Sequence, residues 1–106
     1  QNLKKMKLLL ITAVAEFGKE VKQILKKGNV KTYSYKEVVG YRNASEDALG
    51  SNWFGTEMNE NESIMFYAFV EKENVDIVCS AITEFNSKQE TLSHIHSAVL
   101  NIEKSN

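Results

Sequence analysis

The stretch KLLLITAV, residues 7–14, decides the fold when it is set beside IMFYAFV, residues 64–70. Both are short and almost unbroken apolar runs, which are typical of strands buried on two faces. Each run is followed by apolar residues at helical spacing and then by a second segment that resembles a strand. The chain is therefore one strand–helix–strand unit written twice, over residues 7–39 and again over residues 63–103.

The sequence also predicts where the helices and the outer strands begin and end. The first helix is expected to end at Gly28 and Asn29, which suit a left-handed cap. The second strand is expected over residues 30–39, which are rich in Tyr, Thr and Val. Asn74 is the expected N-cap of the second helix, and residues 95–102 are the expected last strand.

Two such units in succession form the ferredoxin-like plait, an α+β fold with the order βαββαβ. Its four-stranded antiparallel sheet carries both helices on one face. We expect all 106 residues to form a single domain. Within it, residues 1–5 are a predicted N-terminal extension, and residues 40–62 are a long loop between the second and third strands.

The open face of this sheet predicts an assembly. A sheet face that meets water normally alternates toward polar residues. Both predicted inner strands are instead apolar on their two sides. A large apolar surface in a soluble protein marks an interface, so we expect a homo-oligomer with cyclic symmetry, formed through the open sheet faces.

Composition narrows the range of partners and compartments. The net charge of −1 comes from interspersed charges of both signs, which does not indicate binding to nucleic acid or to an anionic membrane. Cys79 is the only cysteine and cannot form a disulfide within the chain, which fits a reducing compartment. Residues 6–15 resemble a signal peptide but are shorter than one, and their removal would delete a predicted strand. We therefore expect a cytoplasmic protein without membrane insertion.

The central loop holds the first candidate binding residues. Long segments without regular structure are uncommon in small domains and are often functional. Trp53 and Phe54 lie in polar surroundings, where they either pack back onto the protein or serve as a contact anchor or lid. Arg42 follows Gly40 and Tyr41 at the root of the loop. It either pairs with a phosphate or carboxylate group or stays solvated.

A second group of candidates follows the second predicted helix. His94 and His96 are two residues apart in a predicted strand and should share one face. They are either ordinary hydrogen-bonding histidines or two ligands of a divalent metal. Lys88 lies between the helix and the strand, where it could hold a phosphate group. No nucleophile–base pair or converging pair of carboxylates is visible, so we do not expect an enzyme.

This layout resembles the PII family, the nitrogen regulatory proteins P-II, over residues 6–104. The stretch VVGY, residues 38–41, is similar to the strand end and glycine that precede the long loop of that family. The resemblance implies a homotrimer with its sheet faces packed inward and a loop that contacts a partner protein, such as a membrane transporter. PII proteins hold ATP through a Gly-Asp-Gly-Lys type of loop after the second helix. Residues 86–93 contain no glycine, so ATP is not expected here.

Three functions follow from these observations. The first is a non-enzymatic PII-like signalling protein that binds a small effector between subunits and a partner through residues 40–62. The second is a metal-binding trimer of the cation-tolerance type that uses His94 and His96. The third is a small ferredoxin-fold enzyme of the dimeric α+β barrel type.

Overall fold

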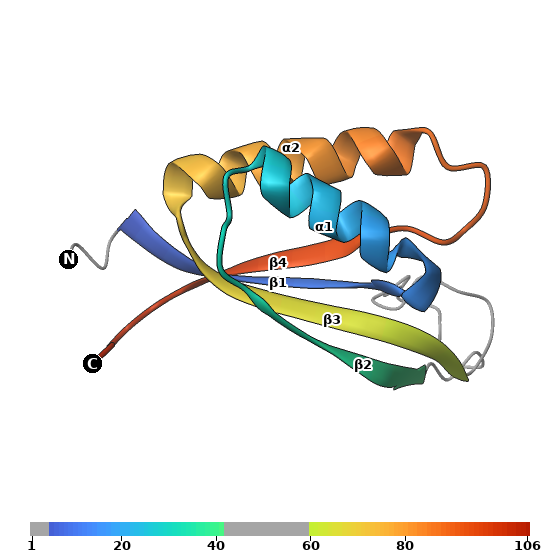
Figure 1. Ribbon diagram of the computed structural model, residues 1–106, viewed down its shortest axis with the longest axis horizontal. Coiled ribbons are helices and arrows are strands. Elements are labelled where there is room, and N and C mark those ends of the chain that lie inside the picture. The colour runs from blue at the N-terminus through green and yellow to red at the C-terminus, as the bar shows by residue number, and fades with distance from the viewer. Residues whose placement is uncertain (1–4, 42–59) are drawn as a thin grey trace.

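The computed structural model describes residues 5–41 and 60–106. Two layers are visible in Figure 1, a twisted sheet and a pair of helices lying across it. The elements in chain order are β1 (Met6–Val14), the short 3₁₀ helix η2 (Ala15–Phe17), α1 (Gly18–Lys27), β2 (Ser34–Tyr41), β3 (Glu60–Glu71), α2 (Lys72–Ser87) and β4 (His96–Asn101).

The sheet confirms the predicted plait. Its strands lie in the order β2-β3-β1-β4, and every neighbouring pair is antiparallel. Both helices cover the same face, and the opposite face carries no element among the described residues (Figure 1). The two apolar runs of the sequence became β1 and β3, the adjacent inner strands.

The core fills the space between the helices and the covered face of the sheet. Leu9 and Ile11 of β1 and Phe66 of β3 are each only 1% exposed. Val21 of α1 and Val78 of α2 belong to the same core cluster, on the helix side, and are fully buried. Burial of these side chains is the main force holding the two layers together, since each contributes about 1.5–3 kcal/mol.

The end of α1 differs from the prediction in the role of each residue. Asn29 alone adopts the left-handed conformation, with φ 61°, whereas Gly28 has φ −82°. The N–H of Val30 donates to the carbonyl of Leu25 at 2.9 Å, and the N–H of Asn29 donates to that of Lys26 at 3.0 Å. These bonds form a Schellman cap.

Gly28 is needed for a different reason. A Cβ atom at this position would lie 2.4 Å from Cγ2 of Val78, so a side chain here would collide with α2. The glycine is therefore required by the close packing of α1 against α2. The left-handed conformation that ends α1 is adopted by Asn29.

The predicted N-cap of α2 was wrong. The helix begins at Lys72, and Glu71, the last residue of β3, is its N-cap. The chain passes from strand to helix without a connecting loop, so Asn74 lies inside the first turn. Glu73 also lies in that turn, where the helix dipole favours a carboxylate.

The bounds of β2 and β3 also differ from the predicted ones. β2 begins four residues later than expected, at Ser34, and continues through Gly40 to Tyr41. β3 begins at Glu60, inside the predicted loop of residues 40–62. Gly40 pairs with Asn61 and Tyr41 with Glu60, so both ends of that segment belong to the sheet.

β4 begins one residue later than predicted because Ile95, the first expected residue, bonds to a side chain of α2 instead of to a strand. The side chain of Asn86 donates to the carbonyl of Ile95 at 2.8 Å and accepts from the N–H of Ile95 at 2.8 Å. This clamp from α2 replaces strand pairing at Ile95, and the strand starts one residue later.

Candidate functional site

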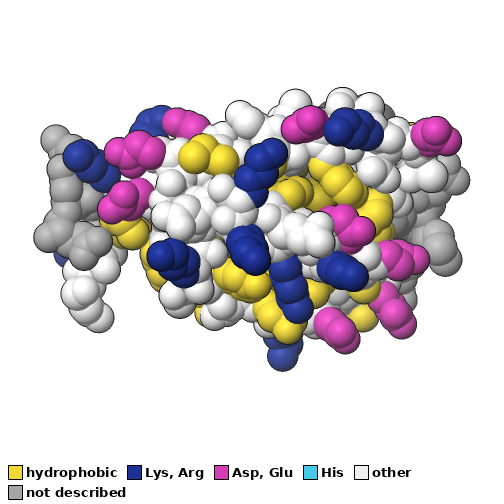
Figure 2. Space-filling model, turned by 45° about the horizontal axis from the view of Figure 1, so that its top comes forward, with side chains coloured by type: hydrophobic (Ala, Val, Ile, Leu, Met, Phe, Trp, Pro, Cys, Tyr) yellow, Lys and Arg dark blue, Asp and Glu magenta, His cyan; other side chains and the backbone are white. Residues whose placement is uncertain are grey.

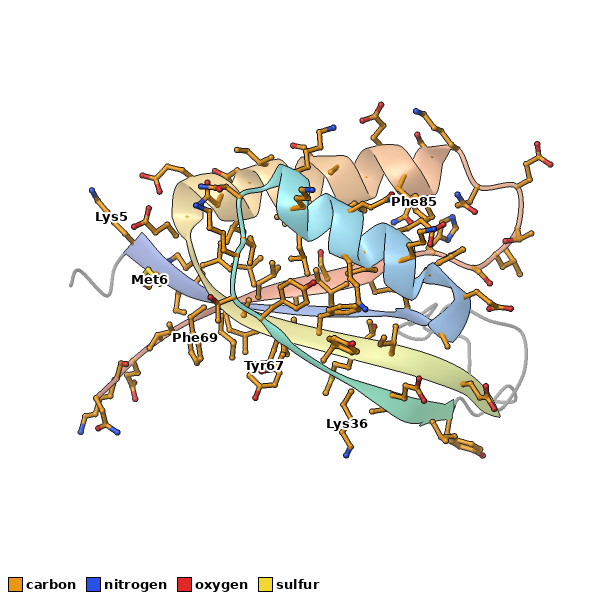
Figure 3. The ribbon with its side chains drawn as sticks, in the orientation of Figure 1. Lys5, Met6, Lys36, Tyr67, Phe69 and Phe85 are labelled. Carbon is orange, nitrogen blue, oxygen red and sulfur yellow. The ribbon has the colours of Figure 1, made fainter. Side chains whose placement is uncertain are left out.

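The open face of the sheet is the first functional feature. Strand register places its apolar residues side by side, with Leu8 opposite Phe69 and Leu10 opposite Tyr67. Phe69 is 60% exposed and Tyr67 is 44% exposed. Both project from the sheet on the side away from the helices, as Figure 3 shows. The apolar residues of the open face are Leu8, Leu10, Met65, Tyr67, Phe69, Ala98 and Leu100.

These residues form a continuous surface rather than scattered contacts, because they come from the adjacent strands β3, β1 and β4. Lys36 of β2 lies at its margin and also points away from the helices (Figure 3). A polar or charged residue at the edge of an apolar centre is common in protein interfaces. The predicted two-faced character of the inner strands is therefore present in the fold.

A hollow at the root of the 40–62 segment is the second feature. It has a volume of about 380 Å³ and lies where β2 and β3 run out toward residues 42–59. Its lining residues are Ala15, Glu37, Val38, Val39, Glu62 and Ser63. Because β2 and β3 both supply lining residues, a ligand here would touch the two strands that carry the segment.

The charge of this root hollow is negative. Glu37 lies opposite Ile64, and Glu62 lies opposite Val39, so the two carboxylates are diagonal neighbours on one face. No Lys or Arg lines the hollow among the described residues. Within the same part of the chain, no group of three metal-ligating side chains is present. The site favours a cationic group over an anion.

The predicted loop residues fall partly within the described chain. Gly40 is buried in β2, and Tyr41 is exposed at its last position. Arg42, Trp53 and Phe54 lie outside the described residues. Their predicted roles in binding stay predictions.

The two histidines lie at the start of β4. His96 is its first residue and pairs with Thr12 of β1, which places it in register with the open face. His94 precedes the strand, and Ile95 between them is buried. Burial, together with the nearby His94, lowers the pKa of His96. The neutral imidazole favoured by this environment is the form that binds metals.

Lys88 is not brought to the root hollow. It is the C-cap of α2, and its ammonium lies 3.4 Å from the carboxylate of Glu84 one turn earlier. With Glu20 and Phe85 it lines a separate depression between the two helices. Within the single chain Lys88 therefore lies apart from the root hollow, and its predicted role in binding stays a prediction.

Sequence reasoning missed that Glu37 of β2 and Glu62 of β3 are diagonal neighbours on one face of the sheet. Each glutamate belongs to a strand, but the register that makes them neighbours depends on β3 starting at Glu60. That start was hidden because residues 60–62 are polar and resemble a loop.

Comparisons with known proteins find similar structures but no similar sequence family. No family model matches the chain, and no curated protein matches it. Among solved structures, it is similar to CPII, a nitrogen regulatory PII-like protein from Thiomonas intermedia K12, bound to ADP, AMP and bicarbonate. The identity is 16%, the alignment covers 95% of this chain and 96% of that one, and the TM-score is 0.62.

Two further structures agree. A DUF3240 family protein from Shewanella baltica OS155 is 10% identical over 96% of this chain and 94% of that one, with a TM-score of 0.65. GlnK of B. subtilis, in complex with ATP, is 19% identical over 92% of this chain and 84% of that one, with a TM-score of 0.59.

The protein is thus a ferredoxin-like plait with an apolar open sheet face. More narrowly, it has the fold of the PII-like nitrogen regulatory proteins, as a divergent example of that fold. Among the described residues, no helix has both the length and the apolar character needed to cross a membrane.

Proposed function

We propose that this protein is a non-enzymatic, cytoplasmic regulator of the PII-like kind. Three copies assemble through their open sheet faces, a small effector binds in the clefts between subunits, and residues 40–62 contact a partner protein. The observation that carries the proposal is the exposed apolar open face on a PII-like fold. A membrane transporter or a regulatory protein is the expected partner.

The open face supports self-association on energetic grounds. Burying apolar surface stabilises an assembly by about 25 cal/mol per Å². Phe69, Tyr67 and Leu100 each leave two fifths or more of their surface in water in the single chain. A trimer, the assembly that the PII resemblance implies, would cover all three.

The charge of the root hollow supports a cationic effector. Known structures of this fold hold adenine nucleotides, namely ADP and AMP in CPII and ATP in GlnK. Here Glu37 and Glu62 would repel a phosphate group, and residues 86–93 contain no glycine for a phosphate loop. We therefore propose a ligand that presents an ammonium group or a divalent metal ion, and we do not expect ATP.

The position of the hollow supports a switching role. Its walls are the ends of the two strands from which residues 42–59 depart. A ligand that binds one arrangement of these strand ends more tightly shifts the population toward that arrangement. The partner would then read the effector through the 40–62 segment.

Calorimetry with divalent metals and spermidine tests this proposal. We expect Ca²⁺, Mn²⁺ or spermidine to release or absorb heat with the wild type and to lose at least tenfold in affinity with Glu37→Gln/Glu62→Gln. A matched control, Glu90→Gln/Glu103→Gln, makes the same charge change at exposed sites outside the hollow. Equal affinities in the two variants would contradict the assignment of the site.

A second candidate function is metal binding by His94 and His96. Two observations favour it. His94 is close enough to His96 to help lower its pKa, and the pairing of His96 with Thr12 places it on the same side of the sheet as the open face. In a trimer built through that face, histidines from three chains would approach one another.

We expect Zn²⁺, Cu²⁺ or Ni²⁺ to bind the wild type and not His94→Ala/His96→Ala. Equal heats from both proteins would contradict this function, whereas the double glutamine variant at Glu37 and Glu62 should bind normally.

A further inference from the structure

The outer side of α1 carries a groove lined by lysines that the proposed function does not use. It has a volume of about 770 Å³ and extends from α1 onto the connection that leads to β2. Four of its lining residues are Lys19, Lys22, Lys26 and Lys31. These four lysines, with the apolar floor of Val30 and Tyr33, are called the lysine groove below. Figure 2 shows Lys side chains gathered around apolar ones in this region of the surface.

Among residues 5–41 and 60–106, no acidic side chain neutralises the positive charges of the groove. Its lining residues from this part of the chain include no Asp or Glu. The ion pairs of the described residues join Lys72 to Asp76 and Lys88 to Glu84, away from the groove. The chain as a whole has a net charge of −1, so this concentration of four cations is local.

Helix formation does not account for these lysines. Lys22 lies three residues after Lys19 and four before Lys26, so all three share one side of α1, where like charges repel. Lys19 is also in the first turn of the helix, where the dipole disfavours a cation. Only Lys26 is placed where the dipole favours it.

The floor of the groove adds a second kind of contact. Val30 is buried, and Tyr33 is half-buried beside the rings of Tyr35 and Phe66, with centroids 6.4 Å and 5.7 Å away. Lys22 is held in place because its ammonium lies 4.5 Å from the centre of the Tyr35 ring and 3.3 Å from its hydroxyl oxygen. One of the four cations is thus anchored above an aromatic cluster.

We propose that the lysine groove binds a small polyanion that carries phosphate groups. The volume suits a small molecule rather than a folded partner. Lysine ammoniums bind phosphate groups as point charges, and four lysines line this groove. The groove is lined mainly by α1 and the connection to β2, and α1 lies on the side of the sheet opposite the open face (Figure 1), so burial of the open faces would not itself cover the groove. The proposal does not depend on the proposed function.

Titration with inorganic tripolyphosphate tests this inference. We expect saturable binding to the wild type that weakens as salt is raised, because exposed charges are screened. Lys19→Gln/Lys26→Gln/Lys31→Gln should bind at least tenfold more weakly. The control Lys27→Gln/Lys72→Gln/Lys104→Gln removes the same charge from exposed positions outside the groove and should bind as the wild type does.

Further measurements distinguish binding in the groove from general attraction between charges. All substituted lysines are exposed, so circular dichroism should show folded variants. Absence of saturable binding to the wild type, or equal weakening in both triple variants, would overturn the proposal. Tighter binding of a hexaglutamate peptide than of tripolyphosphate would overturn the phosphate assignment and point to an acidic protein segment. Sedimentation of the same variants should show unchanged assembly, which distinguishes failure here from failure of the proposed trimer.

Discussion

Gly28 allows the end of α1 to pack closely against α2. The sequence predicts a cap at this place, and the cap exists, but Asn29 supplies its left-handed residue. A glycine at a helix end is usually assigned to that role. The actual requirement, room for Cγ2 of Val78, comes from the packing of α2 and is not visible along the chain.

Replacing Gly28 therefore has a testable cost. We expect Gly28→Ala to destabilise the fold by about 1–3 kcal/mol, the range for overpacking a core. The cost should fall in Gly28→Ala/Val78→Ala, because Val78→Ala removes the methyl group that the new Cβ meets. Urea unfolding of the two single variants and the double variant measures this coupling. Strictly additive losses would show that the contact is not responsible.

Asn86 is a second residue whose role appears only in three dimensions. Its side chain satisfies both backbone groups of Ile95. Asn86→Ala leaves these part-buried groups without that partner, and each unsatisfied group costs about 1–3 kcal/mol. Ser87→Ala is the control, because its exposed hydroxyl donates to the carbonyl of Glu84 within the same helix. We expect a clear fall in melting temperature for the first variant and almost none for the second.

His96 gives a pH dependence with a defined sign. Burial and His94 lower its pKa in the folded protein, so the unfolded chain binds a proton more readily. The free energy of unfolding should therefore fall as pH drops from about 7.5 to about 5, through the ordinary histidine pKa. His96→Gln should flatten this fall in metal-free protein at fixed concentration. An unchanged pH profile in that variant would mean that other groups govern the effect.

At the scale of elements, the inner strands were the most predictable part of the chain. Residues 7–14 and 64–70 are apolar on both sides, and they became β1, with one residue added at its start, and the centre of the longer strand β3. Their two-sided pattern predicted both the covered face and the open face. Pattern alone was sufficient because burial on each face follows directly from side-chain alternation.

The element ends were less predictable because partners determine them. Residues 60–62 are polar, yet they extend β3 because residues 39–41 of β2 pair with them. Asn74 has a good capping side chain, but the direct passage from β3 into α2 places the helix start at Lys72. The acidic root hollow depends on the same register, so it was not predicted either.

At the scale of the whole molecule, fold and assembly were both predicted from one observation. The duplicated unit specifies the plait, which the sheet order and the similar solved structures confirm. The lysine groove and the acidic root hollow lie on different parts of this fold, one on the helix layer and one at the end of the sheet. Their opposite charges favour ligands of opposite sign, so the protein is expected to bind two classes of molecule at independent sites.

Sedimentation velocity tests the central claim, assembly through the open face, most directly. We predict that the wild type sediments as a trimer and that Tyr67→Lys/Phe69→Lys sediments as a monomer, because a buried charge at the interface has no partner. Ile77→Lys is the control, since Ile77 is as exposed as Tyr67, at 44%, but lies on α2. It should remain a trimer. A wild-type monomer, a wild-type dimer of the kind expected for an α+β barrel enzyme, or a trimer that survives the open-face substitutions would contradict the account.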